Sequence, residues 1–244
     1  VHYINVTMPE VDDNRYDVAA NYIDYLGTDK LTAAQVKHQF YKMACNYAIS
    51  VNADYITIGL SGLAEYMPDA LALLEDLLHN AKVDQNAYDQ MVGLILKNRQ
   101  DQKSEQRNCF SMLGAYALYG LHNAMRDNMT EQQLREANPQ ELLDLLKNIS
   151  GYEHQVLYYG PIAKEKLDEC VSDLHPTEKD LKPVPEGKPY ELQTITEPEV
   201  IIAPYDAKNI YMRMFVNEGR QTNLDEHATI ELFNEYFGGG MNGV

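Results

Sequence analysis

The chain has 244 residues, of which 20 are Lys or Arg and 37 are Asp or Glu, so its formal net charge is −17. Such an excess of negative charge excludes binding by electrostatic attraction to nucleic-acid phosphates or to an anionic membrane surface. The length, with 45% apolar residues, predicts one or two folded domains. The sequence has no continuous apolar run of about 18 residues, so no membrane-spanning helix is predicted.

Both ends of the sequence predict a piece of a longer polypeptide. The first residue is Val1 rather than Met, and a strand-like alternation follows at once. The last residues, Gly238 to Val244, follow directly on a helical pattern and carry no polar tail. We therefore expect any signal peptide to lie outside the sequence.

Apolar periodicity predicts a strand, two helices and a hairpin, then a long helical region, a further strand and a last helix. The helix after the first strand is expected to end at Leu26, because Gly27 follows. The expected strands are His2–Met8, Tyr47–Val51, Tyr55–Leu60 and Tyr152–Tyr159. The expected helices are 14–26, Leu31–Met43, Ala64–Lys82, Gln85–Gln106, Cys109–Tyr119, Glu131–Glu136, Pro139–Ile149 and Lys164–Leu174.

Proline content divides the chain. Five prolines fall within His175–Glu199 among lysines and glutamates, which predicts an extended linker. Beyond it, Val200–Ala203 and Ile210–Val216 are expected to be strands and Leu224–Phe237 a helix. The predicted organisation is a domain at 1–174, a linker at 175–199, and the truncated beginning of a second, similar domain at 200–244.

The first strand and helix recur after the linker. Tyr3 and Glu10 match Tyr211 and Glu218 at an offset of 208 residues, and the following helices end in Asp-Tyr-Leu-Gly and Glu-Tyr-Phe-Gly. A repeat in fixed order favours duplication of a whole domain. The alternative is a chance match between two strand–helix units.

Motifs for metal or nucleophilic chemistry are missing from the sequence. Glu153 and His154 are neighbours on a predicted strand, so they should point to opposite faces and be exposed. The stretch from Gly59 to Leu63 resembles a nucleophile elbow, but its second glycine is at position 62 and not at 63, where G-x-S-x-G requires it. None of the histidines lies three to five residues from another, as a helical or loop metal pair would require. They stand at positions 2, 38, 79, 122, 154, 175 and 227.

Two segments resemble a known family. Val18–Thr28 resembles the zinc-site helix of the M16 (insulinase/pitrilysin) metallopeptidases, whose pattern is H-x-x-E-H followed closely by Gly-Thr. Leu232–Asn242 resembles the opening helix and glycine turn of that family's next domain. The Leu-rich helix around Leu71–Leu78 and the stretch LKNRQD at 96–101 lie where the family has them. The resemblance implies an α+β, LuxS/metallopeptidase-like domain with an antiparallel-rich sheet and a helical layer on one face.

The zinc positions depart from that pattern. An inverted zinc motif needs two imidazoles four residues apart on a helix, with a Glu between them that activates the metal-bound water. Asn21 and Tyr25 stand at the imidazole positions and Asp24 at that of the Glu. The family's third ligand, a Glu on a later helix, falls near Leu96. The resemblance therefore implies that this chain has no catalytic residues and binds neither a metal nor another cofactor.

The implied source is the inactive half of a larger zinc metalloendopeptidase. Its implied role is to line the peptide chamber, to bind extended peptide at a sheet edge, and to support the catalytic half of the same polypeptide, where zinc is expected. Neither nucleic acid nor a membrane span is expected, and a bacterial envelope or periplasm is suggested by family analogy alone.

Three alternatives stay open at this point. The chain could be a structural scaffold or assembly subunit that binds no peptide. It could be a self-sufficient hydrolase with an unrecognised set of catalytic residues, or an unrelated α/β domain without an ancestral metal site. Saturable peptide binding separates the first of these from a chamber wall.

Overall fold

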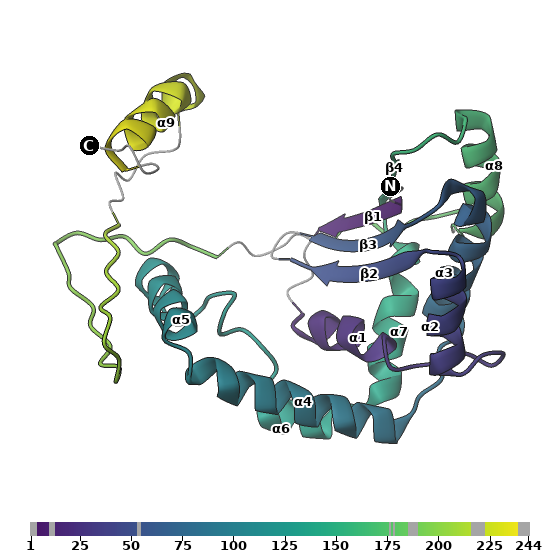
Figure 1. Ribbon diagram of the computed structural model, residues 1–244, viewed down its shortest axis with the longest axis horizontal. Helices are drawn as coiled ribbons and strands as arrows, with labels where there is room; N and C mark the ends of the chain where they lie inside the picture. The colour runs from purple at the N-terminus through teal and green to yellow at the C-terminus, as the bar shows by residue number, and fades with distance from the viewer. Residues whose placement is uncertain are drawn as a thin grey trace. The chain divides into compact units, whose positions relative to one another are not determined.

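The computed structural model describes residues 4–9, 13–52, 55–175, 177, 179–184, 190–215 and 223–238. The chain divides into two compact units, Val1–Glu191 and Leu192–Val244. The first contains the sheet and helices α1 to α8, and the second contains α9, Leu224–Gly238 (Figure 1).

The first unit is built on an antiparallel sheet of strands β1 to β4, in the order β2-β3-β1-β4. The hairpin of β2 and β3 is joined by β1, which starts the chain and pairs with both β3 and β4. In this register Ile4 lies opposite Leu60 on one side and Tyr158 on the other. The strands are Ile4–Pro9, Asn46–Val51, Tyr55–Ser61 and Gln155–Tyr158.

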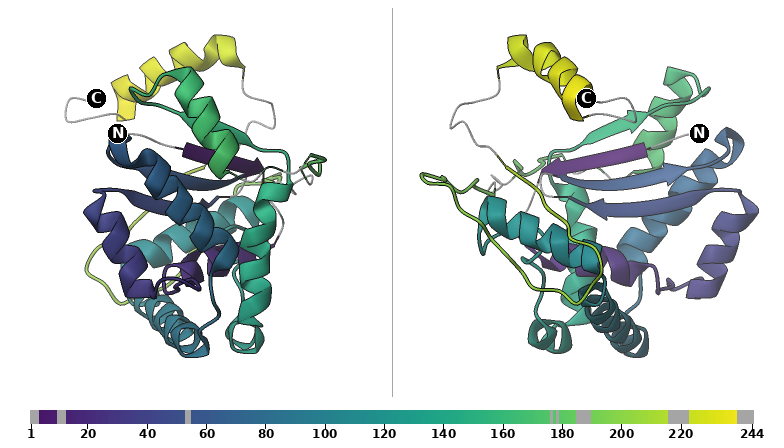
Figure 2. Two further views of the ribbon diagram at one scale, coloured as in Figure 1. Left: turned by 90° about the vertical axis from the view of Figure 1, so that its right-hand side faces the viewer. Right: turned by 60° about the vertical axis from the view of Figure 1, so that its left-hand side comes forward.

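One face of the sheet is apolar and covered. In β3 the side chains of Ile56, Ile58 and Leu60 are buried, and those between them are only partly so. Such alternation puts one set of side chains into the core and the other on the opposite face. The core also takes the inner faces of three helices, which lie beside the strands (Figure 2). They are α1, Arg15–Ile23; α3, Met67–Asn80; and α7, Pro139–Lys147.

Three of the remaining helices, α2 (Ala33–Lys42), α4 (Gln85–Lys103) and α6 (Glu131–Glu136), begin where a side chain bonds an unpaired amide of the first turn. Thr32 and Thr130 form capping boxes with Gln35 and Gln133, and the Asp84 carboxylate accepts from the amide of Ala87. The other elements are η1, Ala64–Tyr66; α5, Gln106–Tyr119; η2, Asn148–Gly151; and α8, Lys164–Leu174. None of the described helices is both long and apolar enough to cross a bilayer.

The predicted α+β class, the antiparallel sheet and most helices are confirmed. The first helix is shorter than predicted and ends at Ile23 instead of Leu26. The helices predicted at Gln85–Gln106 and Cys109–Tyr119 are confirmed as α4 and α5, but the break between them lies at Ser104–Glu105. The strand predicted at Tyr152–Tyr159 is confined to Gln155–Tyr158.

The strands predicted after the linker are wrong for the residues that the structure describes. Residues 200–203 and 210–215 are neither strand nor helix, whereas the predicted helix that follows is confirmed as α9. Alternation alone does not make a strand, because its amides and carbonyls need a partner strand. His2, Tyr3 and Val216 lie outside the described residues, as do Ala53 and Asp54 of the predicted hairpin turn.

The start of the predicted linker is bonded to the first unit. His175 is buried, at 8% exposure. Lys182 forms a parallel bridge with Tyr152, in which its amide donates to Gly151 O at 2.9 Å and its carbonyl accepts from Glu153 N at 2.8 Å. The domain boundaries at 174 and 199, and a second domain like the first, stay predictions.

Replacement of two glycines by alanine is expected to have opposite effects on stability. A Cβ added at Gly27 would lie 2.8 Å from Ala33 N and from Thr32 C, and backbone atoms cannot move aside, so Gly27→Ala should destabilise the fold by about 1–3 kcal/mol. Nothing lies within 4 Å of a Cβ at Gly93 on α4, so Gly93→Ala should stabilise it by about 0.5–1 kcal/mol. Urea unfolding measures both, and a Gly27→Ala variant as stable as the wild type would contradict this account of Gly27.

Candidate functional site

Helix α1 is fixed against the start of α4 by two buried tyrosines. The Tyr22 hydroxyl donates to Asp84 O at 2.9 Å and accepts from Asp84 N at 3.0 Å. The Tyr88 ring meets the Tyr22 ring edge-on at 5.2 Å, and its hydroxyl donates to Leu134 O at 2.7 Å. Burial raises the pKa of both phenols, which therefore stay protonated and able to donate. These bonds set the distance between α1 and α4.

A cleft of about 410 Å³ lies between the C-terminal part of α1 and one face of α4. Its wall combines two amides, a phenol, an ammonium, a carboxylate and three apolar side chains. The lining residues are Asn21, Tyr25, Met91, Leu94, Ile95, Lys97, Asn98 and Asp101. We take this cleft as the candidate functional site.

Two of the four residues at the predicted zinc positions meet in this cleft. Asn21 is exposed on α1, and its Nδ2 donates to Asp17 O at 2.7 Å. Tyr25 comes two residues after the helix ends, in a turn closed by its amide on Tyr22 O at 3.0 Å. Tyr25 is 39% exposed, and the Lys37 ammonium lies 5.7 Å from the centroid of its ring. The two side chains therefore share a cleft without sharing a continuous helix.

The other two predicted positions lie outside the cleft wall. Asp24 follows the last residue of α1, near Tyr47 on β2. Burial, and then the Asp24 carboxylate, raise the pKa of the Tyr47 phenol. Leu96 is half-buried and packs against the core. The neighbouring residue Ile95 lines the cleft, and the third ligand position near Leu96 stays a prediction.

The cleft side chains do not fit a zinc ion. Zinc in proteins takes imidazole, thiolate or carboxylate ligands, usually four, or three with a water. Asn21 offers a neutral amide, Tyr25 a phenol and Ile95 a hydrocarbon, which leaves Asp101 as the single carboxylate of the wall. The same groups suit another task, because amides and a phenol can bond a peptide backbone while the apolar side chains contact its side chains.

Sequence reasoning did not identify the α4 side of the cleft, although a signal was present. The residues of α4 that line it recur at helical spacing, so they fall on one face. That face mixes apolar with amide and charged side chains, and a purely apolar core stripe does not. Its residues are Met91, Leu94, Ile95, Lys97, Asn98 and Asp101.

No family model matches the sequence, and no curated protein matches it. Solved structures do. The chain superposes on the ferredoxin protease FusC in complex with Arabidopsis ferredoxin with a TM-score of 0.62 at 12% identity, over 79% of this chain and 22% of that one. The periplasmic protease PqqL from Escherichia coli gives a TM-score of 0.61 at 13% identity, also over 79% of this chain and 22% of the other.

An inactive domain is among these structures. The peptidase M16 inactive domain from Pseudomonas fluorescens gives a TM-score of 0.57 at 10% identity, over 77% of this chain and 49% of that one. The chain thus spans about a fifth to a half of the length of these proteins. At such identities the likeness defines the fold, and the fold is that of M16-type protease domains. The predicted resemblance is confirmed at this level.

We expect the dialysed protein to hold no stoichiometric zinc, because Asn21, Tyr25 and the apolar wall of α4 do not supply three good ligands. Elemental analysis tests this, and one tightly held zinc per chain would overturn it.

The register of α4 can be tested by building a site. The triple variant Asn21→His, Tyr25→His, Ile95→Glu should bind zinc more tightly than its matched control, in which Leu96→Glu replaces Ile95→Glu, because residue 95 faces the cleft. Zinc titration by calorimetry compares the two. Tighter binding by the control would show that Leu96 is the ligand position.

Tyr22→Phe should destabilise the fold by about 1–3 kcal/mol, because it removes a hydroxyl that satisfies both backbone groups of Asp84. Tyr41→Phe is the matched control, since Tyr41 is 81% exposed and should change nothing measurable. Thermal unfolding measures both, and equal effects would refute the role given to Tyr22.

Proposed function

We propose that the chain is a non-catalytic domain of an M16-family zinc protease. The observation that carries this proposal is the α1–α4 cleft, which has Asn21 and Tyr25 where the inverted zinc motif needs imidazoles. The fold likeness to protease halves and to an M16 inactive domain supports it. The chain has the M16-type fold without the side chains of its zinc site. This combination is expected of a domain whose role is to bind peptide or to support the catalytic half.

In this proposal the domain lines a peptide chamber and holds an extended substrate. The exposed face of β2 carries Asn46, Ala48 and Ser50. Their side chains are small, so an extended peptide can approach β2 closely. Among the described strands β2 pairs only with β3, so its outer edge can accept a further strand. Addition of a strand uses backbone hydrogen bonds and tolerates many sequences, as a protease chamber requires.

The proposed partner is a catalytic M16 half on the same polypeptide, and zinc belongs to that half alone. Several similar structures are about twice as long as the matched region, as two-part proteins would be. A domain at 1–174, a linker at 175–199 and the beginning of a second domain at 200–244 complete this arrangement.

A scaffold without peptide binding is the second candidate, favoured by α5. Met112 and Tyr116 are 40% and 43% exposed on this helix, and all of its residues are at least partly exposed. A helix that is largely apolar is usually covered. In a scaffold, the covering partner would be another subunit.

Peptide titration decides between the two. A short unstructured peptide rich in lysine should give saturable amide shifts in β2, residues 46–51, since the chain carries a net charge of −17 and offers a strand edge. The same peptide with proline at alternate positions is the control, because it lacks the amides that strand addition uses. Absence of saturable shifts, or equal binding of both peptides, would favour the scaffold.

A further inference from the structure

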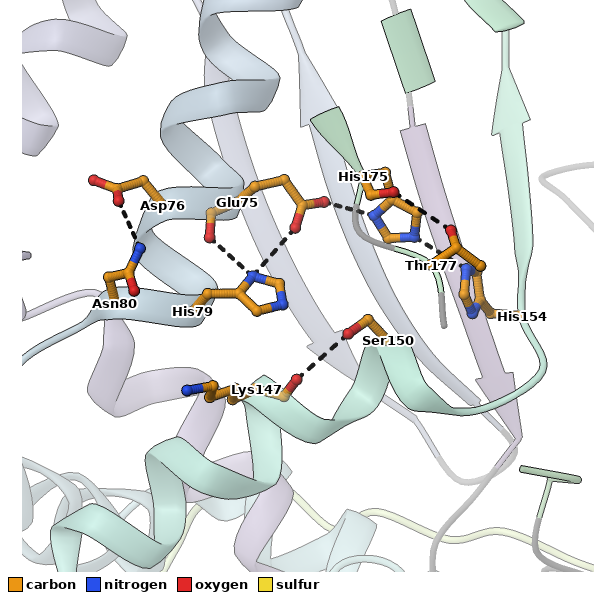
Figure 3. Close-up of polar contacts among 9 residues, drawn as sticks. All are labelled: Glu75, Asp76, His79, Asn80, Lys147, Ser150, His154, His175 and Thr177. Atoms are coloured by element: carbon orange, nitrogen blue, oxygen red, sulfur yellow. Dashed lines mark hydrogen bonds and ion pairs between the residues drawn. The ribbon is translucent and has the colours of Figure 1, made fainter. Parts of the chain in front are cut away.

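Three groups distant in sequence form a buried relay (Figure 3). Glu75 lies on α3, His175 directly follows α8, and His154 directly precedes β4. His175 Nδ1 is 2.6 Å from Glu75 Oε1, and its Nε2 is 3.0 Å from His154 Nε2. His154 Nδ1 is 2.6 Å from Tyr152 O. The side chains of His175 and Glu75 are 8% and 11% exposed.

The three contacts fix how many protons the relay holds. Each contact needs one hydrogen between its two heavy atoms, so three hydrogens are required. Two neutral imidazoles carry two, and the carbonyl of Tyr152 can only accept. The third hydrogen must be an additional proton, whether it sits on Glu75 or on either imidazole. With that proton, Glu75, His175 and His154 together carry no net charge.

Removing or adding a proton breaks this balance. Without it, two nitrogen or oxygen lone pairs face each other across one of the contacts. With one more, both imidazoles are charged and two N–H groups face each other across the 3.0 Å between the Nε2 atoms. Either change replaces a hydrogen bond by a repulsive contact among buried groups, where the local dielectric constant is low.

Other titratable groups close to the relay are few in the described part of the chain. His79 on α3 has its Nδ1 3.0 Å from Glu75 O and 3.4 Å from Glu75 Oε2. The Lys182 ammonium lies 5.7 Å from the centroid of the Tyr152 ring. A small cavity beside Glu75 and His175 is lined mostly by apolar side chains, which come from α3, α7, η2, α8, β3 and β4. Glu75 is thus the acidic side chain in contact with the histidine pair.

We propose that Glu75, His175 and His154 form a proton-dependent latch that holds the chain leaving α8 against the first unit. His175 is the first residue of the Pro-rich linker, and its amide donates to Val171 O at 2.8 Å. The parallel bridge of Lys182 with Tyr152 lies next to His154 and depends on the same segment being in place. In acid, one further proton makes two N–H groups face each other across the Nε2 contact, and the latch opens.

The test is hydrogen exchange of the intact 244-residue chain, corrected for the intrinsic dependence of exchange on pH. The amides of Glu153 and Lys182 report on the bridge. We expect their protection to fall at least about tenfold between pH 7 and pH 5, equivalent to 1.4 kcal/mol. Protection of buried β3 amides such as Ile58 should stay unchanged over the same range.

The decisive variant is His154→Gln, in which an amide can donate to His175 Nε2 without titrating. Its bridge amides should keep the same protection at both pH values. His38→Gln, at an exposed position on α2, is the matched control and should retain the wild-type pH dependence. Nitrogen NMR of the imidazole rings should show His154 and His175 titrating as a coupled pair, unlike His38.

Three results would overturn the latch. The first is protection of Glu153 and Lys182 that does not vary with pH in the wild type. The second is independent titration of the two imidazoles. The third is tight binding of one added zinc ion that shifts both Nε2 resonances, since a metal would then occupy the position assigned to the shared proton.

Discussion

The first unit depends on the one-sided sheet. Because β3 buries Ile56, Ile58 and Leu60 on one face, that face must be covered, and α1, α3 and α7 do so. The other face is left without a described helix against it, and the hairpin leaves β2 at one edge. The proposed peptide would therefore contact only the face and the edge of the sheet that no described helix covers. Its binding would require no distortion of the core.

The same constraint separates the fold from the chemistry at α1. The helix is held by its buried side, where Tyr22 bonds Asp84 and packs on Tyr88. Asn21 and Tyr25 lie on the opposite, cleft side and are not in the core. Substitutions at these two positions can remove a metal site without loosening α1. An M16-type fold with a cleft unsuited to zinc is a consistent outcome of this division.

Local pattern was sufficient to predict the hairpin, most helices and the α+β class, because alternation and helical spacing act over a few residues. The alternation at 200–203 and 210–215 wrongly predicted strands. A strand also needs a neighbouring strand to pair with, and the alternation of residues does not show whether one is present. Of the cleft wall, the sequence indicated Asn21 and Tyr25, whereas the residue that it singled out on α4, Leu96, does not line the cleft and Ile95 does. A shift of one residue turns a helix by about 100°, and only packing decides which side chain faces the cleft.

The histidine relay was beyond sequence reasoning for a different reason. Spacing finds ligands or acids within one turn, whereas Glu75, His154 and His175 come from three separate elements. The segment that follows α3, which carries Glu75, bonds the loop that follows α1, since Lys82 N donates to Gly27 O at 2.9 Å. The buried leucines of α3, from Leu71 to Leu77, fix this helix in the core. The relay can therefore release the chain after α8 without displacing α1, and protonation should leave the α1–α4 cleft as it is.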